Sequence, residues 1–436
     1  MAAGERVSSP TEQAEAVADE LYDFRDHFVE RFGIEKAGEK DAEVSKKMEE
    51  CLQRLDEIQG DVKNKAQLHY LRGKILNVTS KYSPEAEEAL GKAVKLDPRL
   101  VEAWNHLGEC YWKKEDISAA KNCFTGALNH SKNKVSLRNL SMVLRQLSGP
   151  PVEKVKLIEE SIERAKEAVQ LDITDGTSWL ILGNAYVCQT FSQGQNPKAL
   201  KQAMQAYTQA DKDSVARANP DLHFNRAVTY KYIGEYQLAL DGFSMASQLD
   251  PSWSEAKTKE TELLRYLSDV QKMIETKGKM KQKKIDSLSS SISDRDLGPY
   301  SSLEYVDTGG KTVALTCCKL AELQPKINAG KLVVGKVVCS INSTDSVPFP
   351  VCIVDEDQTA IAVMVNKLAQ DAGMKIGDSV AIPEPQLKKV KVSHKETEIS
   401  FPCIQVDSPR LLVVNGRKLG ASKEVQPILS TRAVSD

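Results

Sequence analysis

EAWNHLGECYWKKEDISAAKNCFTGAL, residues 102–128, alternates large and very small side chains at helical spacings. Residues three or four apart share one face of a helix, and two such sets follow each other here. The first set is Trp104, Leu107, Gly108 and Tyr111, and the second is Ala120, Phe124 and Ala127. Small Gly108 and Ala120 would let two helices approach closely, while Tyr111 and Phe124 fill the space around them. The segment therefore predicts a closely packed helix pair.

The spacing matches the 34-residue tetratricopeptide pattern, W-x2-L-G-x2-Y followed by A-x3-F-x2-A. One such pair cannot bury its apolar face alone, so neighbours are expected. The sequence predicts five units between about Ala66 and Pro251, with insertions at "SGPPVEKV" and "FSQGQNPK". Residues 254–284 predict a sixth, weaker helix pair that caps the stack. Two amphipathic helices, about 11–32 and 41–59, are expected to cover the other end.

Composition narrows the class of protein. The chain has 436 residues, 41% hydrophobic and 28% charged, with a formal net charge of −2. That charge argues against coating nucleic acid or membrane through bulk charge, and no apolar run reaches membrane-spanning length. The nine cysteines show no C-x2-C spacing, so we expect neither a disulfide framework nor a zinc site. With no recognisable signal peptide at the start, we expect a cytoplasmic or nuclear protein.

The helical pattern ends in a lysine cluster at 277–284 and a serine-rich stretch that we expect to be a linker without a core. The lysines have two open interpretations: a solvated helix end, or a patch for nuclear localisation or RNA phosphate. From about Leu332 the period changes to two. Five β-rich segments follow, with a short helical stretch at 367–373 between the third and fourth. That order predicts an OB barrel.

Whether this barrel binds nucleic acid stays open from the sequence. Basic residues cluster near the expected last hairpin: Lys388, Lys389, Lys391, His394 and Lys395. The only aromatic residues between Leu332 and Gly416 are Phe349 and Phe401, which is few for stacking bases. We favour a barrel that docks protein or has a structural role.

No catalytic motif appears, and we expect a protein that is not an enzyme and holds no cofactor or metal. The chain has no phosphate-binding glycine loop, no H-E-x-x-H, no G-x-S-x-G and no kinase motifs. His69 and His223 occupy the position of Trp104 in their own repeats, so we expect them to pack between helices.

In stacked repeats the first helix of each unit lines a concave face suited to an extended peptide. The register set by Trp104 predicts the residues of that groove: Asn105, Glu109, Asn139, Arg145, Asn184, Asp221, Asn225, Lys231 and Glu255. Asp221 and Glu255 are 34 residues apart, so they occupy equivalent positions and together suit an Arg side chain or a free amino terminus. Arg145 suits an acidic residue, which it can bind bidentately, and the asparagines suit a peptide main chain. Each of these residues can also be an ordinary exposed helix residue.

Lys92 and Lys95 project from a second helix and are expected on the convex face. Two interpretations are open: a solvated surface, or a contact to phosphate.

Several longer stretches carry a resemblance to a known family: "KAVKLDP", "VEAWNHLGECYWKK", "NKVSLRNLSMVLRQL", "GQNPK", "NPDLHFNRA", "IGDSVAIPEP" and "LLVVNG". Over nearly the whole chain, these motifs resemble the tetratricopeptide repeat protein five family. The resemblance implies an α+β multidomain protein, an all-α tetratricopeptide-repeat superhelix followed by an all-β OB-fold barrel. We place capping helices at 1–65, repeats at 66–285, a linker and domain-joining segment at 286–325 and the OB-fold domain at 326–436.

The resemblance also implies function and partners. It implies a non-enzymatic adaptor that recognises the Met-Arg-Glu start of nascent tubulin at the ribosome and, through an mRNA-decay effector, triggers decay of tubulin mRNA. The peptide-binding residues would be Arg145, Asp221 and Glu255, supported by Asn184, Asn225 and Lys231, and the ribosome-binding residues Lys92 and Lys95. The alternative is a nuclear, stress-responsive transcription cofactor that binds a histone acetyltransferase coactivator, a junction-mediating actin regulator and DNA or chromatin. Neither function involves a membrane.

Overall fold

The computed structural model describes residues 9–192, 197–306, 310–341 and 348–425. These residues form two compact units. The helical unit takes in residues 9–228 and 242–257, and the sheet unit takes in 229–241 and 258–425. Part of the predicted insertion at 191–198 lies outside the described residues.

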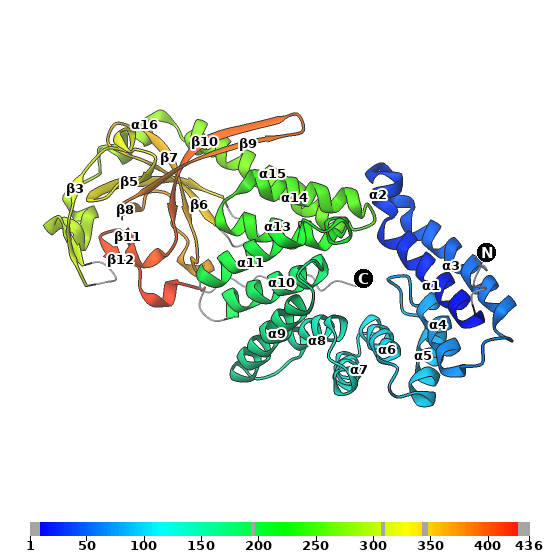
Figure 1. Cartoon of the computed structure of the whole chain (residues 1–436). Coiled ribbons are helices and arrows are strands. Elements are labelled where there is room, and N and C mark those ends of the chain that lie inside the picture. The colour runs from blue at the N-terminus through cyan, green and yellow to red at the C-terminus, as the bar shows by residue number, and fades with distance from the viewer. Residues whose placement is uncertain (1–8, 193–196, 307–309, 342–347, 426–436) are drawn as a thin grey trace, which may run out of the picture. The chain divides into compact units, whose positions relative to one another are not determined.

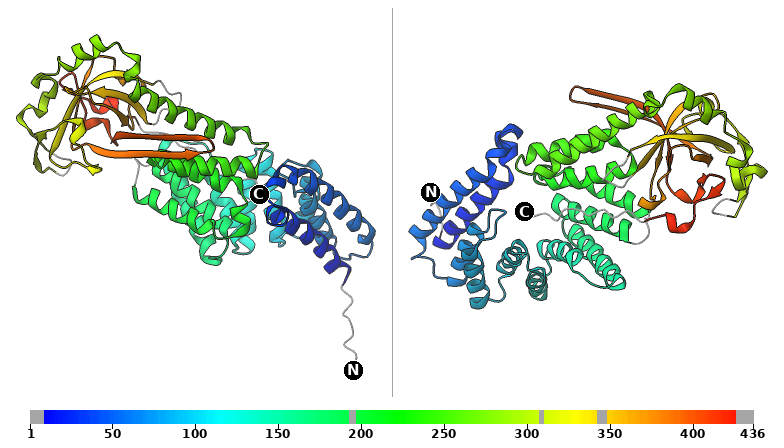
Figure 2. Two further views of the ribbon diagram at one scale, coloured as in Figure 1. Left: turned by 90° about the horizontal axis from the view of Figure 1, so that it is seen from above. Right: turned by 180° about the vertical axis from the view of Figure 1, so that it is seen from behind.

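The helical unit begins with α1 (Pro10–Asp26), α2 (Phe28–Phe32) and α3 (Lys40–Ile58), close to the two predicted N-terminal helices. The repeats are α4 (Lys65–Leu76) with α5 (Pro84–Leu96), α6 (Val101–Lys113) with α7 (Ile117–His130), α8 (Lys134–Gln146) with α9 (Pro151–Leu171), α10 (Gly176–Ser192) with α11 (Pro197–Ala210), and α13 (Pro220–Ile233) with α14 (Tyr236–Leu249). The short α12 (Ser214–Arg217) precedes the last pair. Figures 1 and 2 show the pairs up to α11 stacked in chain order. The five predicted repeats are confirmed.

Glycine on the first helix of a pair makes room for a large side chain on the second. A Cβ at Gly108 would lie 2.6 Å from Cε1 of Phe124, which is completely buried. The same relation recurs between Gly183 and the Tyr207 ring, also at 2.6 Å. Because any larger side chain would overlap the opposing ring, the small and large positions of the repeat depend on each other.

In three of the repeats, an aromatic ring on the first helix ties the helix to the preceding loop. A ring nitrogen bonds a carbonyl six residues earlier in three repeats: Trp104 Nε1 to Pro98 (2.8 Å), Trp179 Nε1 to Ile173 (2.9 Å) and His223 Nε2 to Arg217 (2.8 Å). His223 is buried, and burial lowers its pKa, which favours the neutral ring. The prediction that His223 packs between helices is confirmed, since it is buried and makes the bond that Trp104 and Trp179 make in their own repeats.

The predicted sixth helix pair is a single long helix, α15 (Ser254–Glu275), followed by the short α16 (Gln282–Ser289). The serine-rich stretch after it was expected to lack a core, and this expectation is wrong. Leu297 and Tyr300 are both buried, and the Tyr300 hydroxyl donates to the Leu411 carbonyl at 2.7 Å. Short elements here become core because distant strands cover them.

The main strands of the sheet unit are β5 (Lys331–Ser340), β6 (Phe349–Val354), β7 (Ala360–Val365), β8 (Ser379–Pro383), β9 (Gln386–His394) and β10 (Thr397–Val406). Shorter strands complete it: β1 (Glu304–Val306), β2 (Thr312–Ala314), β3 (Thr316–Cys317), β4 (Lys326–Ile327), β11 (Val413–Val414) and β12 (Arg417–Lys418). The central order is β8-β5-β6-β7-β10-β9, with β10 parallel to β7 and the other neighbours in this run antiparallel. Alternate residues such as Val333, Val351 and Ile404 form its apolar core.

Two details of the barrel differ from the prediction. The expected fourth strand is divided into β8 and β9 at Pro383, Glu384 and Pro385, where Glu384 has a φ of 45°. The expected helix at 367–373 is only a 3₁₀ turn, Gln370–Ala372. Proline removes the amide donor that a continuous strand needs, so the chain turns between the two strands.

Candidate functional site

Arg145 is a buried cation near the end of α8, with an exposed fraction of 9%. Its Nη1 donates to the Ser141 carbonyl (3.1 Å), to Ser141 Oγ (3.0 Å) and to Ser161 Oγ on α9 (3.2 Å). Among the residues that the structure describes, no carboxylate forms an ion pair with it. Burial lowers the pKa of this guanidinium, but an arginine remains charged in proteins. Arg145 is therefore a desolvated positive charge held by neutral acceptors.

A second cation lies beside it. Lys154 Nζ donates to the carbonyls of Arg145 and Leu147, the latter at 2.9 Å, and so satisfies the last carbonyls of α8. Burial, and the charge of Arg145, lower the pKa of Lys154. Two positive groups at one helix end raise the local potential and favour an anionic ligand.

Asn184 and Asn225 come from different repeats and contact each other. Asn225 Nδ2 donates to Asn184 Oδ1 at 3.1 Å, and the Tyr207 hydroxyl donates to the same oxygen at 2.8 Å. Asn184 is completely buried, and its Nδ2 has no hydrogen-bond partner among the described residues. These bonds orient the Asn184 side chain and leave one amide donor available.

We call two neighbouring groups the polar seam: Arg145 with Cys188, and Tyr207 with Asn184 and Asn225. Arg145 hydrogen-bonds the Cys188 sulfur. Burial raises the pKa of Tyr207, against the opposing charge of Arg145, so the hydroxyl stays a donor. Tyr207 fills the large position opposite Gly183, and nothing in the sequence indicates that its hydroxyl bonds the predicted site residue Asn184.

Asp221 and Glu255 lie in the first turns of α13 and α15, at the equivalent positions that their spacing predicted. Asp221 is 5% exposed, whereas Glu255 is exposed. Next to them, the rings of Phe224 and Trp253 pack with centroids 4.4 Å apart and tie the start of α15 to α13. Lys231, on the last turns of α13, is half-buried and belongs to the sheet unit.

The predicted groove residues nearer the N-terminus connect neighbouring repeats. Ser136 Oγ donates to Asn105 Oδ1 at 2.5 Å, and Asn139 Nδ2 donates to Glu109 at 3.4 Å. Burial would raise the pKa of Glu109, but His106 and nearby cations hold it at about 2. Asn105, Glu109 and Asn139 therefore have partners within the protein, which gives them a role in packing.

Lys92 and Lys95 are both exposed on α5. Lys92 pairs with Glu88 one turn earlier, at 2.7 Å, and 53% of its side chain is exposed. The predicted exposure on a second helix is confirmed, and both ammonium groups are accessible to a partner.

The basic cluster of the barrel is divided by the structure. Lys389, Lys391 and Lys395 are exposed, but His394 is buried and its Nε2 lies 2.6 Å from Glu260 Oε1 on α15. Phe401 is 2% exposed, so its ring is part of the core. The cluster therefore offers exposed charge, and the Phe401 ring is not accessible to a stacked base.

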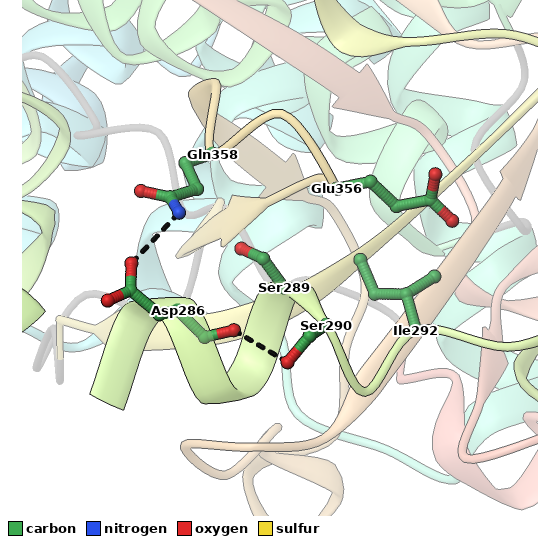
Figure 3. A pocket seen from close by; sticks show the side chains of 6 residues that line it. All are labelled: Asp286, Ser289, Ser290, Ile292, Glu356 and Gln358. Carbon is green, nitrogen blue, oxygen red and sulfur yellow. Dashed lines mark hydrogen bonds between the residues drawn. The ribbon is translucent and has the colours of Figure 1, made fainter. Parts of the chain in front are cut away.

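The surface pocket in Figure 3 lies between α16 and the turn joining β6 to β7 and contains none of the predicted site residues. Its lining is Asp286, Ser289, Ser290, Ile292, Glu356 and Gln358. Gln358 Nε2 donates to Asp286 Oδ1 at 3.0 Å, and Ser290 Oγ donates to the Asp286 carbonyl at 2.8 Å. Over the described ranges, no cluster of three or more His, Cys, Asp or Glu is arranged to hold a metal. Nor does any helix there have the length and apolar character to span a bilayer.

Comparison with known proteins agrees with this architecture. Residues 314–427 match the family model "Tetratricopeptide repeat protein 5 OB fold domain". Human tetratricopeptide repeat protein 5 is 48% identical over 430 residues, and the bovine protein is 48% identical over 432. Each alignment covers 98% of both chains. The solved structure of a thermophilic TPR protein from Thermus thermophilus is 17% identical, with a TM-score of 0.39, and the match covers 46% of this chain and 98% of that one. The protein has a tetratricopeptide-repeat unit and an OB-fold domain, and it shares high identity with the human and bovine proteins, so it is an adaptor that binds other proteins. The chain belongs to the tetratricopeptide repeat protein 5 family.

Proposed function

We propose that the repeats recognise the Met-Arg-Glu start of nascent tubulin and that the protein, docked on the ribosome, triggers decay of the translating mRNA. The observation that carries this proposal is Arg145, a buried guanidinium without a carboxylate partner among the described residues. A charge desolvated in this way destabilises the unbound protein. An acidic residue of the ligand would offset that cost by pairing with the guanidinium. The glutamate of the peptide supplies that charge.

The carboxylates of Asp221 and Glu255 supply the opposite charge. They start two successive first helices, and the Phe224–Trp253 contact holds those starts together. A free amino terminus and an arginine side chain are both cationic donors that pair with carboxylates. A peptide with two positive groups followed by one negative group therefore matches the order of charges from α15 back to α8.

The seam between these ends would bind the peptide main chain. Asn184 Nδ2 is buried and has a free donor, and its orientation is fixed by Tyr207 and Asn225. A peptide carbonyl on this donor would satisfy a polar atom that the described residues leave unsatisfied. Asn225 would support the same segment from α13.

Affinity measurements test this assignment. Fluorescence anisotropy with the full chain would compare a peptide beginning Met-Arg-Glu with the Met-Glu-Arg permutation and with an N-acetylated version. We expect Asp221→Asn to weaken the first peptide, with a cost of about 2–5 kcal/mol if the carboxylate meets a desolvated cation. Equal affinity for the permuted peptide would refute the charge order. An undiminished affinity of the acetylated peptide would assign the carboxylates to the arginine alone.

Ribosome docking is tested separately at Lys92 and Lys95. Because both are exposed, the double change to alanine should leave the free energy of unfolding within about 0.5 kcal/mol of the parent and should leave peptide affinity unchanged. The double variant should no longer cosediment with ribosomes. Cosedimentation of the parent protein should decrease as salt is added. Undiminished cosedimentation would remove these lysines from the docking surface.

The alternative is a nuclear transcription cofactor that binds an acetyltransferase coactivator, a junction-mediating actin regulator and chromatin. In that case the barrel would carry the binding surface. Lys389, Lys391 and Lys395 are the exposed charges that such a role would use. Replacing all three with glutamine and measuring binding to DNA and to ribosomes separates the two proposals. We infer a distribution between cytoplasm and nucleus, with no enzymatic activity in either.

A further inference from the structure

Cys339 and Cys352 lie directly opposite each other on the antiparallel strands β5 and β6. Opposed residues of such strands project on the same face, with Cα atoms about 4.5–5.5 Å apart. That separation lies within the range of about 4.4–6.8 Å that a disulfide spans. None of the nine cysteines forms a disulfide in the structure. The two thiols are therefore reduced and already placed for a bond.

The two thiols differ in environment. Cys352 is completely buried, whereas Cys339 is half-buried, next to a bulge that shifts the register between Val337 and Cys339. A hydrogen bond from Cys352 lowers the pKa of Cys339, while the same bond, together with burial, raises the pKa of Cys352. Cys339 is also the more exposed of the two sulfurs, so an oxidant in solution reaches it first.

The outer sulfur also contacts a second element of the sheet unit. Cys339 Sγ lies 3.9 Å from the Met273 carbonyl at the end of α15, and Gly278 in the following turn packs against its side chain. Gly278 has a φ of 64°, and a Cβ there would overlap Cys339. A change at Cys339 would therefore be felt by the turn that follows α15.

We propose that Cys339 and Cys352 form a reversible redox pair in the OB domain, oxidised to a disulfide by hydrogen peroxide. The Cys339 thiolate attacks peroxide and becomes a sulfenic acid, with release of hydroxide that a proton converts to water. Cys352 then attacks the sulfenic sulfur, an S–S bond forms, and a second water leaves with the Cys352 proton. In total two thiols lose two electrons and two protons, and one peroxide becomes two waters.

In the disulfide, Cys339 Sγ is bonded to Cys352 and no longer donates to the Met273 carbonyl. The contact between β5 and the end of α15 is then weakened, while β5 and β6 are joined covalently. The pair thus couples oxidation to the packing of α15 against the sheet.

Mass spectrometry tests the proposal. The full-length reduced protein is treated with hydrogen peroxide, alkylated and digested without reductant. We expect a linked peptide pair containing residues 339 and 352 that disappears on reduction. In the Cys352→Ser variant, oxidation should stop at a sulfenic acid on Cys339, which dimedone traps. This dimedone signal should be at least about tenfold larger than the signal on Cys352 in the Cys339→Ser variant. Hydrogen exchange of backbone amides in 273–281 should rise on oxidation of the parent and stay unchanged in Cys339→Ser.

Matched controls separate this pair from the other thiols. Cys403→Ser removes another buried cysteine of the same sheet and should leave the linked peptide unchanged. Cys317→Ser with Cys318→Ser removes the vicinal pair and should also leave it unchanged. Oxidation confined to Cys317 and Cys318, or sulfenic acid on Cys352 in place of Cys339, would overturn the proposal. Thermal unfolding of each variant confirms that it is folded before oxidation.

Discussion

Replacing Arg145 with methionine is expected to stabilise the protein while abolishing recognition of an acidic ligand. The change removes a buried charge that has no carboxylate partner among the described residues. Methionine has a similar length and adapts to irregular space, so the cavity left behind is small. Arginine at this position thus costs stability in the unbound protein.

The oxygen atoms that accept from Arg145 remain satisfied after the change. Ser141 Oγ and Ser161 Oγ lie 3.1 Å apart and hydrogen-bond each other. The Ser141 carbonyl still accepts the backbone amide of residue 145 within α8. With no buried polar atom left without a partner, we expect the free energy of unfolding to rise by about 1–4 kcal/mol, as found when buried charges are replaced by apolar side chains.

Ligand affinity should move in the opposite direction. If the guanidinium meets a glutamate, truncating one member of a buried charge pair costs about 2–5 kcal/mol, or at least about thirtyfold in Kd. Urea denaturation followed by far-UV circular dichroism measures the first quantity, and peptide anisotropy measures the second.

Arg138→Met on the same helix is the matched control. Arg138 is also largely buried, but it pairs with Asp175 at 3.3 Å, and only 10% of that side chain is exposed. Its loss leaves a buried carboxylate with fewer partners, so this variant should be destabilised. If Arg145→Met were destabilised to the same extent and still bound the peptide normally, the guanidinium would be a structural group and the reasoning would fail.

Two further predictions concern stability. Gly108→Ala should lower the free energy of unfolding by about 1–3 kcal/mol, because the new Cβ would lie 2.6 Å from the Phe124 ring. The control is Gly91→Ala on α5, where the new Cβ meets nothing within 4 Å, and this change should raise the free energy of unfolding by about 0.4–1 kcal/mol. Equal effects of the two changes in thermal denaturation would contradict the packing argument. Burial would raise the pKa of Glu260, but hydrogen bonds and charges of Lys395 and His394 lower it overall. The contribution of Glu260 to the free energy of unfolding is therefore complete above its ordinary pKa of 4.5, and it is lost as pH falls through the lower pKa of the folded state. Glu260→Gln should therefore flatten the acid side of the stability profile below about pH 4.5, and an unchanged slope in pH-dependent denaturation would refute this.

Local pattern was enough to predict the helical unit. The spacing of Trp104, Leu107, Gly108 and Tyr111 defines which face of a helix is buried, and the periodicity of an α-helix is a property of consecutive residues. The exposure of Lys92 on a second helix followed from the same register. The five repeats and the five β-rich segments were therefore predictable without any knowledge of distant contacts.

Elements that depend on distant partners were predicted less well. Tyr300 and Leu297 lie in a serine-rich stretch whose composition indicates a linker, and they become core only because β11 and its neighbours cover them. The predicted fourth strand is two strands, since the paired prolines around Glu384 permit a turn that composition alone had not revealed.

The candidate site shows the same division. Sequence register alone identified Arg145, Asn184, Asp221 and Asn225 as positions on first helices. Three facts depend on tertiary packing: Arg145 is desolvated without a carboxylate partner among the described residues, Tyr207 and Asn225 both donate to Asn184, and Cys339 faces Cys352. Periodicity determines the face on which a side chain lies, but burial, pairing and strand register depend on which distant residues come to lie beside it, and only the folded chain decides those.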